Sequence, residues 1–385
     1  MRLPAALVLI AFLLAIPYVN PVSGGQYEDA FSAYQRGDYT TAYRLFKPLA
    51  EQGNTKAQVW IGSIYHDGQG VPQNYNEAMK WYQRAAEQKN AKAEHNIGVM
   101  YFEGLGVPKD EKEAVKWFRM AAEQGFPQAQ FNLGVAYYYG MGVPKDYVEA
   151  VKWFRMAAEQ GLRQAQFNLG VAYKYGMGIP RDYAEAVKWF RKAAEEGLPQ
   201  AQFNLGVAYQ YGMGVPKDYA EAVKWYKPAA VQGYANAQYN LGFMYFKGQG
   251  VSLNYVEAAK WYRKAAEQGD VEAQYSLGYL YSQGQGVPQD YSETAKWYKR
   301  AAEQGDAQAQ LHLGVMYNRG QGVTKDYVMA HMLYDLAASR DSVSEAKLRE
   351  TAAKYRDIVA SDMTPAQIAE AQRLAREWKP KREGK

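Results

Sequence analysis

Four histidines are the side chains best suited to acid–base or metal chemistry, and they stand at His66, His95, His312 and His331. Metal ligands on one helix face would be spaced as His-x-x-x-His or Glu-x-x-His, and neither pair occurs. The chain has no cysteine, which excludes disulfides, thiol nucleophiles, thiolate zinc sites and iron–sulfur clusters. No nucleophile-elbow pattern surrounds a serine. We interpret the histidines as surface or groove residues and predict no enzyme, no catalytic residue, no metal site and no cofactor.

A Gly-x-Gly loop, such as Gly140-Met141-Gly142, recurs eight times and is the pattern that could suggest phosphate binding. A phosphate-binding glycine loop follows a strand and opens a helix whose first turn meets the ligand. Here a helical segment precedes each loop, so we interpret the glycines as turn residues. Carboxylates are abundant too, but they recur at positions suited to helix capping and ion pairs. Neither pattern predicts a catalytic site.

Tryptophan reveals the period of the chain. Seven tryptophans follow one another at intervals of 36 residues, and the same register continues at Leu45 and Leu333: Trp81, Trp117, Trp153, Trp189, Trp225, Trp261 and Trp297. A fixed spacing between 20 and 50 residues is typical of proteins built from stacked repeats. No insertion disturbs the register, so the sequence predicts about nine units.

Each unit contains two predicted helices. In one unit, Ala129, Leu133 and Tyr137 recur at i, i+4 and i+8 on one face of a first helix. Gly134 beside Leu133 predicts close approach of a neighbouring helix, and a glycine ends the first helix. A second helix begins at Asp146, which with a glutamate three residues later predicts a variant capping box. Because one unit buries only one face by itself, units must stack.

The first 25 residues have the order of a secretion signal. Arg2 is followed by an apolar run over residues 3–16, a break at Pro17 and small residues at 22–25. The run is short for a membrane span, which needs about 20 residues. We predict an exported protein, periplasmic or secreted, without a transmembrane domain after cleavage. An uncleaved N-terminal anchor is the alternative.

Three segments are therefore expected: the signal over 1–25, the solenoid over 26–339, and capping helices with a basic tail over 340–385. The two capping helices are predicted at Ser344–Val359 and Thr364–Trp378. The second opens on an N-cap threonine followed by proline and, at the third position, glutamine.

The repeating unit resembles a known family. Its pattern is Ala-Gln-x-x-Leu-Gly-x-x-Tyr-x-x-Gly-x-Gly-Val-x-x-Asp-Tyr-x-Glu-Ala-x-x-Trp-x-x-x-Ala-Ala-Glu-x-Gly, which is similar to the Sel-one-like repeat (SLR), a longer-looped relative of the tetratricopeptide repeat. The resemblance implies an all-α, right-handed superhelix of antiparallel helix pairs. It also implies adaptor or scaffold roles, often in bacterial envelope signalling, polysaccharide export or host interaction. A cysteine-rich branch has been linked to β-lactam binding, and this chain departs from it.

The net charge of +5 is uneven. Residues 373–385 carry six Lys or Arg and two Glu, and together with Arg2 they account for all of it. The neutral body offers no sign of the clustered basic face that nucleic-acid binding needs, so no nucleic-acid partner is predicted. We expect the tail to be solvated; contact with an anionic surface is the alternative.

One face of the first helices, opposite the predicted core, forms an aromatic strip with a ladder of asparagines. By similarity to tetratricopeptide proteins, it would line a concave groove. Asparagine can both donate and accept hydrogen bonds, and tyrosine offers large contact area at low entropy cost. The candidate partner-binding residues are Phe131, Asn132, Tyr138, Phe167, Asn168, Lys174, Phe203, Asn204, Gln210, Tyr239, Asn240 and Phe243.

Two interpretations of this strip remain open. The aromatic side chains could hold a partner, or they could pack between neighbouring first helices while the asparagines bond across repeats. Three functional classes follow. The first is a non-enzymatic scaffold for a protein or peptide, as a monomer. The second is a binder of envelope polysaccharide, and the third is an enzyme or enzyme regulator acting on peptidoglycan.

Overall fold

The structure is a computed structural model that describes residues 25–339 and 346–381. These residues form twenty α-helices and no strand, which confirms the all-α prediction. Contacts divide the helices into two compact units, with the division between Ala193 and Ala194. The predicted secretion signal, apart from Gly25, lies outside the described residues.

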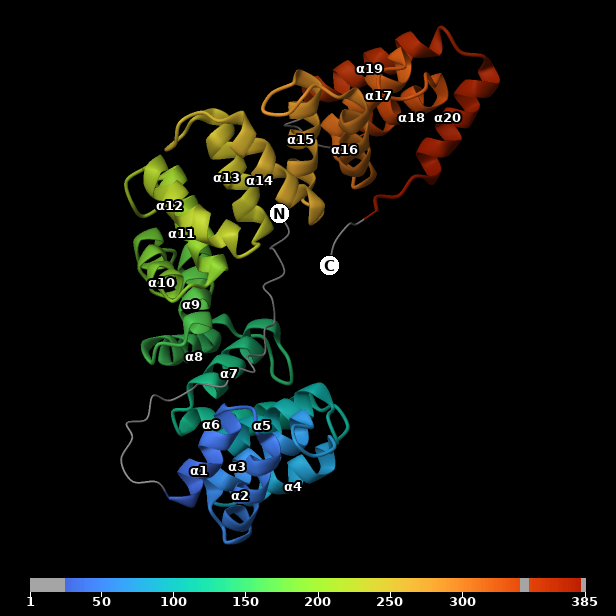
Figure 1. Cartoon of the computed structure of the whole chain (residues 1–385). Helices are drawn as coiled ribbons and strands as arrows, with labels where there is room; N and C mark the ends of the chain where they lie inside the picture. The colour runs from blue at the N-terminus through green and yellow to red at the C-terminus, as the bar shows by residue number, and fades with distance from the viewer. Residues whose placement is uncertain (1–24, 340–345, 382–385) are drawn as a thin grey trace. The chain divides into compact units, whose positions relative to one another are not determined.

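The first unit contains five helix pairs, drawn from blue to green in Figure 1. Its helices are α1 (Gln26–Gln35), α2 (Tyr39–Glu51), α3 (Thr55–Asp67), α4 (Tyr75–Ala86), α5 (Ala91–Glu103), α6 (Glu111–Glu123), α7 (Pro127–Tyr139), α8 (Tyr147–Glu159), α9 (Arg163–Tyr175) and α10 (Tyr183–Glu195), whose last residues cross the division.

The second unit contains four further repeats and two additional helices, drawn from green to red in Figure 1. Its helices are α11 (Pro199–Tyr211), α12 (Tyr219–Val231), α13 (Ala235–Lys247), α14 (Tyr255–Glu267), α15 (Val271–Gln283), α16 (Tyr291–Glu303), α17 (Ala307–Arg319), α18 (Tyr327–Ala338), α19 (Ala346–Ala360) and α20 (Pro365–Glu377).

Within each unit, a first helix (odd number) packs on the second helix (even number) of its own pair, and each second helix packs on the next first helix. Glycine makes the close approach within a pair possible. A Cβ atom on Gly134 would lie 2.7 Å from the ring of Phe154 in the second helix. At the end of the first helix, Gly140 has a positive φ of 76°, as predicted for a glycine that ends a helix.

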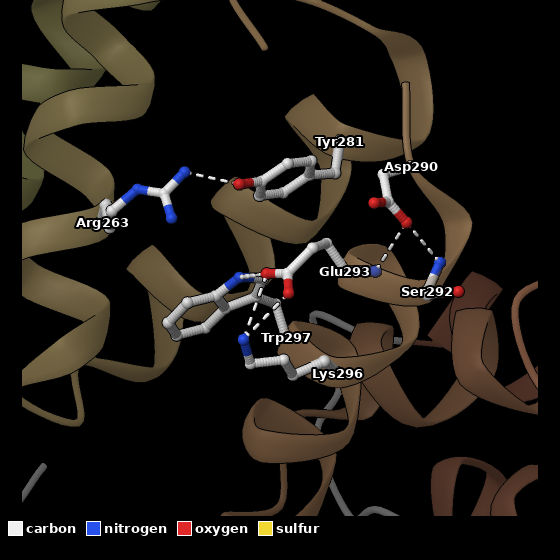
Figure 2. A network of polar contacts seen from close by, with 7 residues as sticks. All are labelled: Arg263, Tyr281, Asp290, Ser292, Glu293, Lys296 and Trp297. Carbon is white, nitrogen blue, oxygen red and sulfur yellow. Dashed lines mark hydrogen bonds and ion pairs between the residues drawn. The ribbon is translucent and has the colours of Figure 1, made fainter. Parts of the chain in front are cut away.

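Most second helices begin with an aspartate cap, as predicted, while α4 and α14 begin with an asparagine, and the glutamate does not complete a capping box. Figure 2 shows one case, in which the Asp290 carboxylate accepts hydrogen bonds from the backbone N–H groups of Ser292 and Glu293. The Glu293 carboxylate instead accepts from Lys296 Nζ at 2.9 Å and from Trp297 Nε1 at 3.0 Å. Because lysine competes for this carboxylate one turn later, the glutamate becomes half of a surface ion pair.

A buried glutamine in the first helix connects successive repeats. Gln130 Nε2 donates to the carbonyl oxygen of Ala122 in the preceding second helix (3.2 Å), and Gln130 Oε1 accepts from Gln160 Nε2 (2.8 Å). The donation satisfies a carbonyl near a helix C-terminus. The same donation to an alanine carbonyl eight residues earlier is made by Gln58, Gln166, Gln202, Gln238, Gln274 and Gln310. We call these bonds the glutamine seam.

The C-terminal helices pack on the last repeat. Both α19 and α20 contact α18, and Thr364 forms the predicted capping box with Gln367. Met363, Leu374 and Trp378 pack against the cluster that contains Leu333. The backbone N–H of Lys381 donates to the carbonyl oxygen of Glu303 at 2.8 Å, so the described part of the basic tail lies against α16. Among residues 25–339 and 346–381, no helix combines the length and apolar character needed to cross a bilayer.

One position of the glutamine seam is occupied by a titratable residue. Glu94 is 1% exposed and accepts a hydrogen bond from Gln124 Nε2, but an ionised carboxylate cannot donate to an alanine carbonyl. Burial raises the pKa of Glu94, against the opposing effects of the Gln124 hydrogen bond and the charge of Lys89. A raised pKa means that the folded state binds the proton more tightly than the unfolded chain. The contribution of Glu94 to stability is therefore greatest below its ordinary pKa and is lost as the pH rises through the folded-state pKa.

We expect Glu94→Gln to stabilise the protein by roughly 1 kcal/mol near pH 7, because the amide restores the missing donor. The gain should shrink near about pH 4, where protonated Glu94 can itself donate. Urea denaturation followed by circular dichroism at both pH values measures the effect. The reciprocal variant Gln130→Glu is the control and should lose stability at neutral pH. An unchanged or lower midpoint for Glu94→Gln at pH 7 would contradict this account.

Candidate partner-binding groove

An open pocket of about 310 Å³ lies between α13, α14 and α15 in the second unit. We call this pocket and the side chains around it the aromatic groove. It is lined by six aromatic side chains, one lysine and one serine: Tyr239, Phe243, Phe246, Lys247, Tyr262, Tyr275, Ser276 and Tyr279.

The helix register places these side chains together. Tyr239, Phe243 and Phe246 lie at i, i+4 and i+7, so they share one face of α13. Tyr262 belongs to the second helix α14 and is buried beneath them, with its ring centroid 5.6 Å from that of Tyr239. Gly242 admits this ring, because a Cβ atom there would lie 2.8 Å from it. The base of the groove is therefore fixed by backbone packing.

The opposite side of the groove comes from the next first helix, α15. Tyr275 stacks on Tyr298 with ring centroids 5.4 Å apart, and its other neighbour is His312 at 5.9 Å. Tyr279 makes an edge contact with Phe246 at 6.2 Å and remains 37% exposed. Rings that are held by other rings lose little conformational entropy when a ligand binds.

The groove contains hydrogen-bond donors and one cation. Burial raises the pKa of Tyr239 and of Tyr275 to about 12, so both hydroxyl groups stay neutral at physiological pH. Lys247 Nζ lies 5.0 Å from the ring centroid of Phe246 and 5.9 Å from that of Phe243. No carboxylate or imidazole lines the pocket, so its residues are suited to binding rather than to general acid–base chemistry.

The groove is much larger than its equivalent in an earlier repeat. The equivalent crevice four repeats earlier is lined by Phe102, Phe118, Asn132 and Val135, and it holds only about 10 Å³. This volume is about that of one water molecule. Ser276 and Tyr279 of the groove stand where the crevice has Asn132 and Val135, so the side chains that line the two spaces differ. The aromatic groove is thus a local departure from the repeat pattern.

Two of the predicted partner-binding residues, Tyr239 and Phe243, line the groove. The other candidates in the second unit do not. Asn240 is half-buried and hydrogen-bonds the hydroxyl of Tyr226, which also donates to the buried Gln210. Phe203 is half-buried against Tyr226 and Tyr234, with ring centroids 5.8 Å and 5.4 Å away. Asn204 Nδ2 donates to the carbonyl oxygen of Gln200 at 2.8 Å.

In the first unit, the expectation of an exposed strip is wrong at Phe131 and Asn132. Phe131 is 5% exposed, with its ring centroid 5.8 Å from that of Phe154. Asn132 is 7% exposed, and its Nδ2 donates to His95 Nε2 at 3.0 Å. The acceptor role requires a neutral imidazole, and burial lowers the pKa of His95 to about 4. Here Asn132 bonds across repeats, as the alternative interpretation predicts, whereas the ring of Phe131 contacts Phe154 of its own second helix.

The remaining candidates in the first unit are half-buried, and their role in binding stays a prediction. Phe167 packs against Phe190 with ring centroids 5.8 Å apart, and Asn168 follows it on α9. The ring of Tyr138 contacts those of Tyr139 and Tyr147. Burial lowers the pKa of Lys174.

The predicted set lacks the four groove residues of α14 and α15, together with Phe246 and Lys247 on α13. Tyr275, Ser276 and Tyr279 stand one 36-residue step after Tyr239, Asn240 and Phe243, so extending the register by one repeat would have found them. Tyr262 follows Trp261 on the apolar face of a second helix, a position that predicts core. It is a core residue whose ring also lines the pocket.

Two of the four histidines occupy different environments from those expected. His95 and His331 are buried, so the prediction of surface or groove positions is wrong for them. His66 Nδ1 lies 2.7 Å from the carboxylate of Asp67, and His312 is exposed beside Tyr275. Within the described residues, no group of three or more His, Asp or Glu side chains could hold a metal ion.

A family model described as the Sel1 repeat matches nine consecutive segments of the chain: 25–54, 55–90, 91–126, 127–162, 163–198, 199–234, 235–270, 271–306 and 307–342. The crystal structure of a Sel1 repeat protein from Oxalobacter formigenes is 34% identical, with 88% of this chain and 98% of that chain covered and a TM-score of 0.60. The crystal structure of a protective antigen from uropathogenic Escherichia coli strains, which displays an SLR fold, is 34% identical over 92% of this chain and 91% of that chain, with a TM-score of 0.49. A comparison with curated proteins gives no match.

Because Phe131 is buried and Tyr279 is partly exposed, replacing each ring with alanine should lower the stability of the protein by different amounts. Phe131→Ala should destabilise the protein by about 3 kcal/mol or more, because it leaves a cavity in a packed cluster. Tyr279→Ala should cost less than about 1 kcal/mol, because its ring is already partly solvated. The midpoint of urea-induced loss of helical circular dichroism measures both. Equal losses would mean that the two rings do not differ in burial.

Proposed function

The chain belongs to the Sel1 repeat family, and from this premise we propose that it is a non-enzymatic scaffold that holds a protein or peptide partner in the aromatic groove. The observation that carries the proposal is the pocket of about 310 Å³ lined by six aromatic side chains. Its volume lies at the lower end of the range for ligand sites, which suits one or two anchoring side chains of a larger partner. Aromatic pockets of this kind are typical hot spots of protein interfaces.

The chemistry of the groove favours binding over turnover. Its tyrosine hydroxyls are neutral donors and acceptors, and its apolar rings are already ordered by one another. The partner would therefore bury apolar area with little loss of side-chain entropy in this protein. General acid–base catalysis most often uses an imidazole or a carboxylate within reach of the substrate, and the lining residues include neither.

An envelope polysaccharide is the second candidate. The exposed face of Tyr279 could stack on a sugar ring, and the hydroxyls of Tyr239 and Tyr275 could bond sugar hydroxyls. A neutral polysaccharide would be recognised by rings and hydroxyls alone, whereas a peptide could also engage Lys247. Retention of the protein by insoluble peptidoglycan would favour this candidate or a regulator of peptidoglycan enzymes.

A photoreactive aromatic residue in place of Tyr279 tests the scaffold proposal. In cells that produce this protein, we expect irradiation to yield discrete adducts with one or a few proteins. The matched control carries the same residue at Val256, which is 61% exposed on α14 and does not line the pocket. Adding Ser276→Asn, the residue found at equivalent positions of this chain, should suppress the adducts by filling the groove. Identical adducts from both positions, or none from Tyr279, would reject the groove as the binding site.

We also propose that the protein acts in the cell envelope after export, on the strength of the charge, apolar run and small-residue order of residues 1–25. Cell fractionation with mass measurement of the purified chain tests it. We expect the protein outside the cytoplasm, shortened by about 25 residues at its N-terminus. A full-length chain in the envelope would favour the uncleaved anchor, and a cytoplasmic chain would contradict export.

A further inference from the structure

We propose that the aromatic groove selects an extended peptide segment that carries a basic residue near one end, an acidic residue near the other and an apolar or aromatic side chain between them. The inference rests on the proposed function and deepens it, because it names the chemistry of the partner. It is carried by two charged residues, Glu272 and Lys247, at opposite ends of the groove.

Glu272 belongs to the same helix face as the groove tyrosines. Glu272, Tyr275 and Tyr279 lie at i, i+3 and i+7 on α15, and such residues share one face of a helix. Glu272 stands in the first turn, one residue after the helix begins. Its charge also raises the pKa of Tyr239, which lines the pocket from α13. A carboxylate therefore lies beside the end of the groove where Tyr239 stands.

Lys247 marks the other end. It is the last residue of α13, lines the pocket directly and lies over the rings of Phe243 and Phe246. Successive first helices run in the same direction, because each is followed by an antiparallel second helix. The first turn of α15 and the last turn of α13 are therefore at opposite ends of the groove.

Neither charge is neutralised by a described residue. The lysines of the second helices pair with a glutamate three residues earlier, as Lys260 does with Glu257 at 3.1 Å and Lys296 with Glu293 at 2.9 Å. Lys247 and Glu272 take part in no such pair within the described residues. The nearby Asp270 carboxylate is engaged as the N-cap of α15, where it accepts from the backbone N–H of Ala273 at 2.8 Å. The carboxylate of Glu272 is thus available to pair with a cation of a partner.

The separation of the two charges sets the length of the segment. The repeat position equivalent to Glu272 on α13 is Asn236, eleven residues before Lys247. At 1.5 Å per residue, this offset corresponds to roughly 16 Å along the helix axis. An extended chain covers about 3.3 Å per residue, so about five residues span the groove.

Charge complementarity favours a peptide over the other occupants. A cation near Glu272 and an anion near Lys247 would satisfy both unpaired groups, while a ring or aliphatic side chain enters the pocket between them. A neutral sugar chain offers no charge to either end. An acidic polysaccharide would suit Lys247 and would be repelled by Glu272.

Isothermal titration of the mature chain with short peptides tests the inference. The probe is acetyl-Lys-Ala-Phe-Ala-Glu-amide, and the comparison peptide has glutamine at both charged positions. The reversed order, Glu-Ala-Phe-Ala-Lys, is measured as well, because the groove charges do not fix the direction of the backbone. We expect the better of the two dipolar peptides to bind roughly fivefold more tightly than the neutral one, with the advantage reduced by salt.

Variants assign the effect to the two residues. Lys247→Gln and Glu272→Gln are exposed positions at which folding should be retained, and each should remove about half of the charge-dependent advantage in free energy. The matched control Glu257→Gln changes a paired carboxylate on α14 and should leave binding unchanged. Ser276→Asn should weaken all peptides equally, because it fills the pocket that holds the phenyl ring. Circular dichroism checks that each variant is folded.

The outcomes separate this inference from the function on which it rests. If the neutral peptide binds as tightly as both dipolar peptides, and Ser276→Asn abolishes that binding, the charge inference is overturned and the groove remains a peptide site. If an acidic or basic peptide without the opposite charge binds best, the dipolar pattern is wrong. If no peptide binds while the protein is retained by insoluble polysaccharide, both proposals are rejected in favour of a glycan.

Discussion

The packing of each second helix on the next first helix is the contact on which the stacking depends, and at seven of these junctions a buried glutamine also donates to an alanine carbonyl of the preceding second helix. This bond reaches from one repeat to the one before it, as Gln130 does with Ala122, and the repeats still pack together where Glu94 replaces the glutamine. An unsatisfied carbonyl at a buried helix end would cost free energy, so the bond adds to the packing that holds neighbouring pairs together. The spacing of the aromatic rows on α13 and α15 follows from this constraint. The backbone packing between successive repeats is the same along the chain, while the side chains on the first helices vary. The groove lies where these side chains leave space.

Much of the architecture could be predicted from the sequence because its causes are local or periodic. The tryptophan spacing gave the repeat, Asp290 and its equivalents gave the helix starts, and Gly134 gave the close approach within a pair. Each of these is a property of one residue type at one place, independent of the rest of the chain. The handedness of the superhelix stays a prediction.

The candidate site was harder to predict than the fold, because a helical wheel treats a helix as having one buried face and one exposed face. A first helix here is contacted by its own second helix, by the preceding pair and by the following pair, so Phe131 and Asn132 are buried on the face opposite Ala129. Whether a crevice on that face is filled or open depends on the volumes of the side chains that line it. The crevice lined by Asn132 is nearly filled and the pocket lined by Ser276 is open, and the repeat period does not predict this difference in volume. The effect of Glu94, which stands in place of a glutamine, likewise depends on the alanine carbonyl that it faces and could not be predicted from the sequence alone.

The helices α19 and α20 cover the end of the stack that follows the last repeat. In a solenoid, the trailing face of each repeat complements the leading face of the next, and an uncovered trailing face would present the same complement to another molecule. Contacts of that kind are head-to-tail and do not close, so they propagate into filaments. Met363, Leu374 and Trp378 occupy this face on the last repeat. The helices α19 and α20 therefore cover the surface that another copy of the chain would otherwise meet.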